Sequence, residues 1–304
     1  MRGIKKKALL ICMSVFFVLG SFIGCGAENK KEDTKEIAQG YQWEVTKDGK
    51  TLYLIGTMHP IDTSYNYFSE KIEEIISKTD VLSVEVNPTQ EDAVLANAMM
   101  VYSNGKNIES DLEVDEVKTL KRLCKDAGLD YEKLKVFTPL GISQNISAVI
   151  YQKANLVMAT FDDMLIERYS TDGKEVDQVE NMKFQMELLN KIQGKDALKE
   201  MLQAYEEGSF EELSEESVEY AKNVMEAYKK GEEDFMNEAI EMQKENPDTY
   251  KALILDRNKG MVEKIEEYIN SDKSYVVAVG ALHFFGEDGV VKMLEDKGYT
   301  VKKG

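Results

Sequence analysis

Apolar runs of strand length lie near both ends of this chain, and a long stretch of helical periodicity separates them. Leu52–Ile55 and Tyr275–Val279 are almost wholly apolar, which is typical of buried strands. Between about 89 and 270 the apolar residues mostly recur at helical spacing, with acidic residues on the outer faces. We therefore predict an α/β fold whose central sheet combines N-terminal and C-terminal strands, with a long helical insert at about 89–270.

Further patterns fill in the elements around these runs. Glycine in Thr46–Lys50 favours a hairpin turn, and Asn87-Pro88 can end one strand and cap and open the next helix. The other predicted strands are Tyr41–Val45, Val81–Val86, the alternating segment Gly173–Val179 and Tyr299–Lys302. Helices are predicted at Ser69–Lys78 and Gly289–Lys297, outside the insert, and at Pro247–Ile269, at its end.

The chain has only two histidines, and each is the last residue of a Gly-x-x-His motif. His59 ends Gly-Thr-Met-His after the first apolar run, and His283 ends Gly-Ala-Leu-His after the second. Imidazole is the side chain best suited to bind metal or move protons near neutral pH. Gly56 and Gly280 would let the backbone turn tightly, so that each ring points back over the sheet. We predict one site built from these two halves, against the alternative of two hydrogen-bonded structural histidines.

Glu85 lies near the carboxyl end of the apolar strand Val81–Val86. A buried carboxylate needs a partner, a hydrogen bond or a metal, whereas a strand-end glutamate can simply reach water. His59, Glu85 and His283 would all follow the carboxyl ends of strands, where α/β sheets gather ligands. Two imidazoles and one carboxylate form a first shell for a divalent ion such as Mn, Co or Zn.

Arg257 and Asn258 occupy the apolar face of the predicted helix Pro247–Ile269. A guanidinium and an amide on a buried stripe indicate a polar pocket against that helix. Arg257 can hold a carboxylate or steady an oxyanion, and Asn258 can donate to a carbonyl. The alternative is a core ion pair between Arg257 and Glu85 or another acid.

Glu180 and Gln185 form a weaker group of candidates. Glu180 precedes a predicted helix that carries Gln185, so it can cap that helix or enter the site. The sequence contains no phosphate-binding glycine loop, no Cys-x-x-Cys and no recognisable serine-nucleophile elbow.

The first residues have the layout of a bacterial lipoprotein signal. A basic start and the apolar run from Ala8 to Ile23 precede Gly24-Cys25. We predict a signal peptide at 1–24, a lipidated Cys25 with a solvated tether over 25–40, and a single domain over 41–304. The alternatives are a plain membrane anchor and simple secretion.

Charge and cysteine usage agree with an extracytoplasmic chain that is attached to the membrane through lipid. The formal charge is −18, and loss of the signal's Arg2 and three lysines changes it to −22. Such an acidic chain repels phosphates, so we expect no nucleic-acid partner and no basic membrane-binding patch. Only Cys124 remains as a free thiol once the signal is lost and Cys25 is modified, so no disulfide is expected.

Taken together, these motifs resemble the TraB/PrgY/GumN family, which includes the TIKI proteins. The residues that carry the resemblance are Gly56-x-x-His59, Val84–Pro88, Arg257-Asn258, Gly280-x-x-His283-x-x-Gly286 and the ending Gly289–Val301. The resemblance spans about Tyr41 to Lys302. It implies an α/β core related to erythromycin esterase-like and ChaN-like folds. Gln178-Val179-Glu180 departs from the Leu-Glu-Thr common in that family, while Gln185 matches.

The resemblance also implies an activity and a site. Some TIKI relatives are described as metal-dependent peptidases, and members of the pheromone-shutdown branch act on or sequester a signalling peptide. We therefore expect a metal-dependent hydrolase, most simply a peptidase, acting on a peptide or protein outside the cytoplasm. His59, Glu85 and His283 would bind metal, and Arg257 and Asn258 would orient substrate. The alternatives are a metal-independent, esterase-like hydrolase with a histidine base, and a lipoprotein that binds a peptide or metal ligand without cleaving it.

Overall fold

The computed structural model of the protein describes residues 35–156 and 159–304. These residues fall into two compact units. The sheet unit comprises 35–87, 159–181 and 224–304, and the helical unit comprises 88–156 and 182–223. The chain therefore leaves the sheet unit twice and returns to it twice. The sheet unit also includes parts of the 89–270 region that was predicted as a helical insert.

The sheet unit contains a mixed six-stranded sheet in the order β4-β3-β5-β2-β1-β6. β4, β3, β5 and β2 run parallel to one another, and β1 pairs antiparallel with both β2 and β6. The strands are β1 (Tyr41–Lys47), β2 (Lys50–Thr57), β3 (Val81–Val84), β4 (Glu175–Gln178), β5 (Tyr275–Gly280) and β6 (Thr300–Lys303). The predicted α/β fold with terminal strands at its centre is confirmed, and the alternating segment Gly173–Val179 supplies the edge strand β4.

Local sequence explains the first hairpin and the buried centre of the sheet. Lys47 pairs with Lys50 across Asp48 and Gly49, which both have positive φ (51° and 78°), as a two-residue turn of the primed type requires. β3 is buried along its length, and β5 is buried except at its two ends. Continuous burial of this kind belongs to parallel strands that are covered on both faces.

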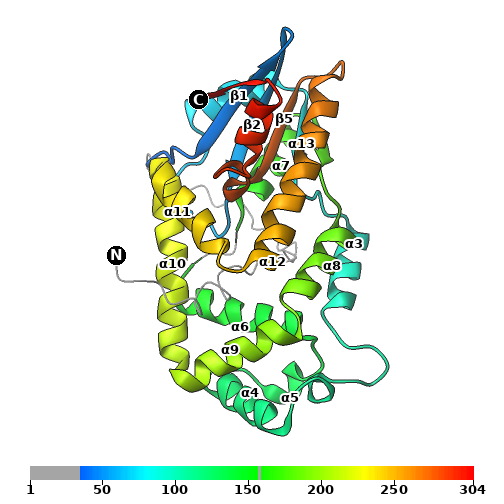
Figure 1. Ribbon diagram of the computed structural model, residues 1–304, viewed down its shortest axis with the longest axis vertical. Coiled ribbons are helices and arrows are strands. Elements are labelled where there is room, and N and C mark those ends of the chain that lie inside the picture. The colour runs from blue at the N-terminus through cyan, green and yellow to red at the C-terminus, as the bar shows by residue number, and fades with distance from the viewer. Residues whose placement is uncertain (1–34, 157–158) are drawn as a thin grey trace. The chain divides into compact units, whose positions relative to one another are not determined.

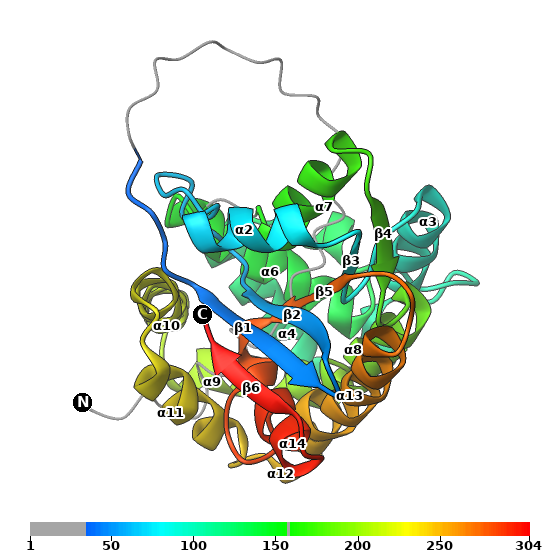
Figure 2. The same ribbon diagram turned by 90° about the horizontal axis from the view of Figure 1, so that it is seen from above.

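Helices of the sheet unit cover both faces of its sheet. α2 and α7 lie on one side and α13 and α14 on the other (Figure 2). Figure 1 shows α13 beside β5 and β2, against which it packs. The helices of this unit are α2 (Glu70–Lys78), α7 (Phe161–Thr171), α11 (Glu233–Gln243), α12 (Pro247–Tyr250), α13 (Asp256–Ile269) and α14 (Val290–Asp296), with a short 3₁₀ turn η3 (Ala281–Phe284).

The predicted helix Pro247–Ile269 contains a π-helical turn, η2 (Lys251–Leu255), between α12 and α13. The amide of Asp256 donates to the carbonyl of Lys251, five residues earlier, instead of four. The burial predicted for this helix is nevertheless correct, because Leu253, Ile254 and Met261 are all buried. A π-turn adds a residue to one turn and is often found beside a functional site.

The helical unit has its own apolar core. Its elements are α3 (Gln90–Met99), η1 (Ile108–Ser110), α4 (Val114–Ala127), α5 (Tyr131–Leu134), α6 (Pro139–Lys153), α8 (Met182–Ile192), α9 (Lys195–Glu207) and the first part of α10 (Phe210–Lys230), which ends in the sheet unit. Leu120, Leu123, Ile142 and Leu198 are fully buried in this core. The free thiol of Cys124 is buried among them, and burial raises its pKa to about 11.

The cap predicted for the helix after β3 is wrong by two residues. Thr89, not Asn87, caps α3, in a reciprocal capping box with Asp92. The amide of Asn87 instead donates to the side chain of Gln178, 2.9 Å away, which ties the end of β3 to the end of β4. The competing tertiary hydrogen bond explains why the sequence pattern misplaced the cap.

The last residues of the predicted tether are part of the fold. Ile37 forms a bridge with Asn66, Ala38 is buried, and the amide of Gln39 donates to the carbonyl of Lys229 at 2.8 Å. The predicted signal peptide and Cys25 lie outside the described residues. Within the described part of the chain, no helix is both long and apolar enough to cross a bilayer.

Candidate functional site

Four parallel strands deliver side chains to one edge of the sheet. Glu180 follows β4 by two residues, Glu85 follows β3 directly, His283 lies three residues after β5, and His59 lies two residues after β2. Because β4, β3, β5 and β2 are neighbours in this order, their carboxyl ends adjoin. The sheet thus brings to one edge residues that lie more than 220 positions apart in the sequence.

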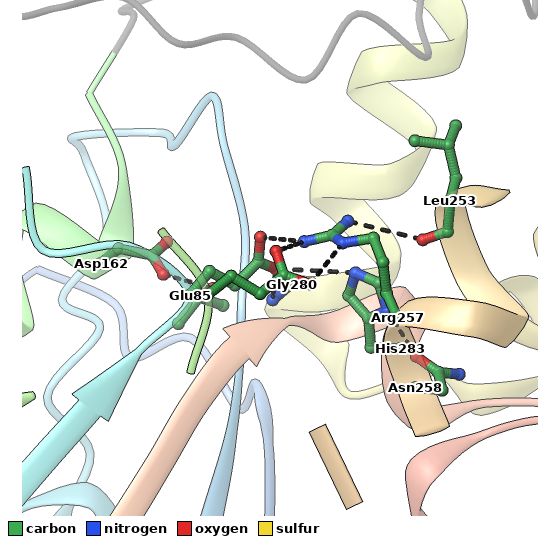
Figure 3. Close-up of polar contacts among 9 residues, drawn as sticks. Glu85, Asp162, Leu253, Arg257, Asn258, Gly280 and His283 are labelled. Atoms are coloured by element: carbon green, nitrogen blue, oxygen red, sulfur yellow. Dashed lines mark hydrogen bonds and ion pairs between the residues drawn. The ribbon is translucent and has the colours of Figure 1, made fainter. Parts of the chain in front are cut away.

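Arg257 is the centre of a buried ion-pair cluster (Figure 3). Its Nη2 donates to Glu85 Oε2 at 2.6 Å, while its Nε and Nη2 donate to the two oxygens of Glu180 at 2.9 Å each. Only 5 % of the Arg257 side chain is exposed, against 17 % for Glu85 and 9 % for Glu180. Arg257 is therefore committed to two acids of the protein, as the core ion-pair alternative predicted, and Glu180 enters the site.

Burial and neighbouring charges shift the pKa values in this cluster in opposite directions. Burial lowers the pKa of Arg257, but the charges of Glu85 and Glu180 outweigh it and raise that pKa. Burial raises the pKa of Glu85, but Arg257 and the amide of Gly280 outweigh it and hold the carboxyl well below its usual range. The Glu85 carboxyl is thus ionised at neutral pH, with Arg257 and the Gly280 amide as partners.

Asn258 holds His283 in one tautomer. Asn258 Nδ2 donates to the carbonyl of Asp288 at 2.6 Å, so its Oδ1 must be the atom that faces His283 Nδ1, also at 2.6 Å. Since an amide oxygen only accepts, the proton of the neutral ring lies on Nδ1 and the lone pair lies on Nε2. Asn258 is fully buried, and both its oxygen and one of its N–H groups are engaged within the protein.

The free lone pair of His283 faces Glu85. His283 Nε2 lies 3.6 Å from Glu85 Oε1, which also accepts from the Gly280 amide at 2.8 Å. Burial, followed by the charge of Arg257, lowers the pKa of His283 to about 3, so the ring is neutral near pH 7. A carboxylate oxygen and an imidazole lone pair converge here, and both are groups that bind a cation.

Gly56 and Gly280 provide space, not a special backbone conformation. Neither is among the residues with positive φ, and Gly280 has φ −48°. A Cβ on Gly56 would lie 3.1 Å from the Cα of Ala281, and one on Gly280 would lie 3.2 Å from Glu85 Oε1. Gly280 precedes the turn η3, as predicted, whereas Gly56 lies within β2, and both glycines stand where a side chain would meet close neighbours.

His59 occupies the other half of the predicted pair. Its Nδ1 is buried and has no hydrogen-bond partner within residues 35–156 and 159–304. Burial lowers the pKa of this imidazole, and the charge of Glu85 opposes the shift. An unpartnered buried imidazole nitrogen is costly, and it becomes favourable when it binds a ligand.

Asp162 is a site residue that the sequence patterns did not reveal. It lies in the first turn of α7. It accepts a hydrogen bond at 3.0 Å from the Oγ1 of Thr57, which lies between Gly56 and His59 in the sequence. Burial and the charge of Glu85 raise the pKa of Asp162 to about 8. Two acids at the start of a helix are ordinarily read as favourable dipole partners, so the pattern Thr160-Phe161-Asp162-Asp163 gave no separate signal.

His283 and Asp162 should give opposite responses of stability to acid. The folded pKa of His283 is lowered, so only the unfolded chain binds its proton between pH 6.5 and about 3. The folded pKa of Asp162 is raised, so the folded chain keeps a proton that the unfolded chain releases above pH 3.8. When the pH falls from 6 to 5, the unfolding free energy of the parent should fall by about 1 kcal/mol through His283 and rise by about 1 kcal/mol through Asp162. His283→Gln lacks the fall, so it should gain about 1 kcal/mol relative to the parent. Asp162→Asn lacks the rise, so it should lose about 1 kcal/mol relative to the parent.

Urea unfolding of chelator-treated protein at the two pH values measures both changes. Comparing each variant with itself at the two pH values removes any pH-independent effect of the substitution. Equal pH responses in the parent and both variants would contradict the assigned protonation states.

Within the described residues, no group of three or more histidine, cysteine, aspartate or glutamate side chains is arranged to hold a metal ion. The residues predicted as ligands are placed as a close pair, Glu85 and His283, with His59 on the adjacent strand end. Gln185, a supporting candidate, belongs to α8 of the helical unit and is buried there.

One of three comparisons with known proteins gave a match. A search of curated proteins and a search of solved structures each gave no match. The profile of the TraB/PrgY/gumN family matches residues 42–303, which include every strand-end residue described above. The chain therefore belongs to the TraB/PrgY/gumN family.

Proposed function

We propose that this protein is a metal-dependent hydrolase, most simply a peptidase, that acts outside the cytoplasm. The observation that carries the proposal is the pairing of His283 Nε2 with Glu85 Oε1, 3.6 Å apart, with the ring proton held on the opposite nitrogen. Two lone-pair groups that face each other in a buried place repel unless a cation lies between them. A divalent ion such as Mn, Co or Zn suits a mixed imidazole and carboxylate donor set.

Two further observations support a cation at this edge of the sheet. The Glu85 carboxyl is ionised at neutral pH, so it is an anionic donor for a cation. The unpartnered Nδ1 of His59 supplies a third donor atom from the adjacent strand end. Glu85, His283 and His59 would hold the ion, which when bound would lower the pKa of a water and polarise a scissile carbonyl.

The surrounding residues would act by holding these donors in place. Arg257 fixes Glu85 by a charged hydrogen bond and thereby keeps the carboxylate ionised. Asn258 orients His283 and sets its tautomer, as partners of metal-binding histidines commonly do. Gly280 leaves room for the carboxylate and donates its amide to it.

A metal-free hydrolase with a histidine base is less well supported. A base whose pKa is about 3 carries out little proton abstraction near pH 7, because it has weak affinity for the proton. Arg257 is also fully engaged with two carboxylates, so it has little freedom to stabilise an oxyanion. The other alternative is a binding protein that holds a metal or peptide without cleaving it. Such a protein would show no hydrolysis in a peptidase assay, whereas the enzyme would.

The membrane attachment proposed for the chain rests on its first residues. Gly24-Cys25 follows a basic start and a short apolar run, as in bacterial lipoprotein signals. Lipidation of Cys25 would place the enzyme on the outer side of the membrane, with a peptide or protein as its substrate.

Metal content tests the proposed function directly. The purified chain, His59→Ala and His283→Ala are loaded separately with Mn, Co and Zn, dialysed and subjected to elemental analysis. We expect near-stoichiometric metal in the parent and loss of at least tenfold in affinity in both variants, with peptide hydrolysis by the loaded parent. Glu167→Gln, an exposed acid on α7, serves as the control that keeps its metal. A parent that retains none of the three ions would contradict the proposal.

A further inference from the structure

We propose that Asp162 is the acid of this site, and that it protonates the amine released when a peptide bond is cleaved. The proposal rests on the hydrolase function proposed above and assigns a role that neither histidine nor Arg257 fills. His283 is held as a neutral lone-pair donor, and Arg257 is bound to two glutamates. A hydrolase needs one further group that can release a proton to the leaving nitrogen.

Asp162 is tied to the loop that carries His59. The amide of Phe161 donates to the carbonyl of Met58 at 3.2 Å, and Thr57 Oγ1 donates to Asp162 Oδ1 at 3.0 Å. Thr57 and Met58, which lie between Gly56 and His59, thus hold both the carboxyl group of Asp162 and the start of α7 in place. In the view of Figure 3, Asp162 and Arg257 lie on opposite sides of Glu85.

The carboxyl of Asp162 has few partners. Apart from its own backbone amide, Thr57 is its only hydrogen-bond donor within the described residues, and no lysine, arginine or histidine there forms an ion pair with it. The side chain is only partly buried, which leaves a way for substrate to reach it. Its neighbour Asp163 is exposed and is occupied in capping α7 with Thr160.

The electrostatic environment keeps a proton on this carboxyl near neutral pH. Burial raises the pKa of Asp162 first, and the charge of Glu85 raises it further, to about 8. Glu85 itself stays ionised because Arg257 holds it. Two carboxyl groups whose environments push their pKa values apart are a recurring sign of one acid and one electrostatic partner.

The proton transfers balance over one turnover. The oxygen of the attacking water bonds to the carbonyl carbon, and the carbonyl π electrons move to its oxygen. Asp162 gives its proton to the amide nitrogen. The electron pair on the former carbonyl oxygen then re-forms the C=O bond as the C–N bond breaks with its electron pair going to nitrogen. The added water oxygen then returns a proton to the Asp162 carboxylate, so that water and a peptide become a carboxylic acid and an amine.

The test uses two substrates that share an acyl group. One is a peptide with an amine leaving group, and the other is a 4-nitrophenyl ester, whose leaving phenolate needs no proton. In metal-loaded Asp162→Asn, kcat on the peptide should fall about 10²- to 10⁴-fold, while kcat on the ester should fall less than tenfold. The metal content of the variant should equal that of the parent. Glu167→Gln, on the same helix, should match the parent on both substrates.

The outcomes separate this assignment from the proposed function. An active parent whose Asp162→Asn variant keeps its peptide rate, or loses both substrates equally, would overturn the role of Asp162 and leave the hydrolase intact. Loss of metal in Asp162→Asn would also overturn it, because Asp162 would then be a ligand. A metal-loaded parent that cleaves no peptide would overturn both.

Discussion

Arg257→Met should destabilise the protein by about 3–5 kcal/mol at pH 7, measured by urea unfolding. The substitution keeps an unbranched apolar side chain but leaves Glu85 and Glu180 buried without their shared cation. An uncompensated buried charge has this order of cost. The loss should shrink at pH 5, because burial without Arg257 raises the pKa of Glu85, and the proton that Glu85 then takes up favours the folded state on acidification.

Arg168 offers a matched control for this experiment. It also makes three charged hydrogen bonds to two acids, Glu73 and Asp172, at 2.7–2.9 Å. Its side chain is 34 % exposed, however, so water can solvate those acids when the arginine is removed. Arg168→Met should lose about 1 kcal/mol or less. Similar losses in the two variants would show that burial does not set the strength of the Arg257 cluster.

Asn258→Leu should weaken metal binding about 10- to 100-fold, the range found when the partner of a ligating histidine is removed. Leucine has nearly the same shape, but it leaves the Nδ1 proton of His283 and the carbonyl of Asp288 without partners. The ring can then move its proton to Nε2, which removes the lone pair that faces Glu85. Unfolding free energy should also fall by about 1–3 kcal/mol, since buried polar groups lose their partners. Isothermal titration with Zn and urea unfolding measure the two effects.

Two comparison variants make this result specific. Asn237 is exposed and accepts a hydrogen bond from Gly286, in the same loop as Asp288, so Asn237→Leu should keep its metal affinity. Asn258→Asp can still accept the proton of His283 but cannot donate to Asp288. It should bind metal more tightly than Asn258→Leu while remaining less stable than the parent. Unchanged affinity in Asn258→Leu would show that the tautomer does not matter.

The sequence was sufficient to predict the sheet and the residues at its edge. The apolar runs of strand length and the two Gly-x-x-His motifs are local signals, because each is contained in one short segment of the sequence. Arg257 and Asn258 were recognisable because a polar pair interrupts an otherwise apolar helical face. Each of these signals can be recognised from the pattern of residues within a single helix or strand.

What the sequence did not reveal depends on contacts between distant elements. Asp162 resembles any acid in a first helical turn, and only the fold brings Thr57 and Glu85 to it. The position of the cap at Thr89 and the partner of Asn87 were likewise decided by the neighbouring strand. The π-turn at Lys251–Leu255 leaves the apolar spacing unchanged, so periodicity could not distinguish it from an α-helix.

The position of β5 between β3 and β2 has a consequence for how the chain matures. β3 and β2 are synthesised early, but they do not pair with each other and must wait for a strand that begins at Tyr275. Closing such long loops delays folding and leaves strand edges open in the meantime. A chain that stops short of residue 275 would lack both the central strand and His283. Premature release during synthesis would therefore yield a protease-sensitive product, and the strand-end cluster would be complete only when synthesis is nearly finished.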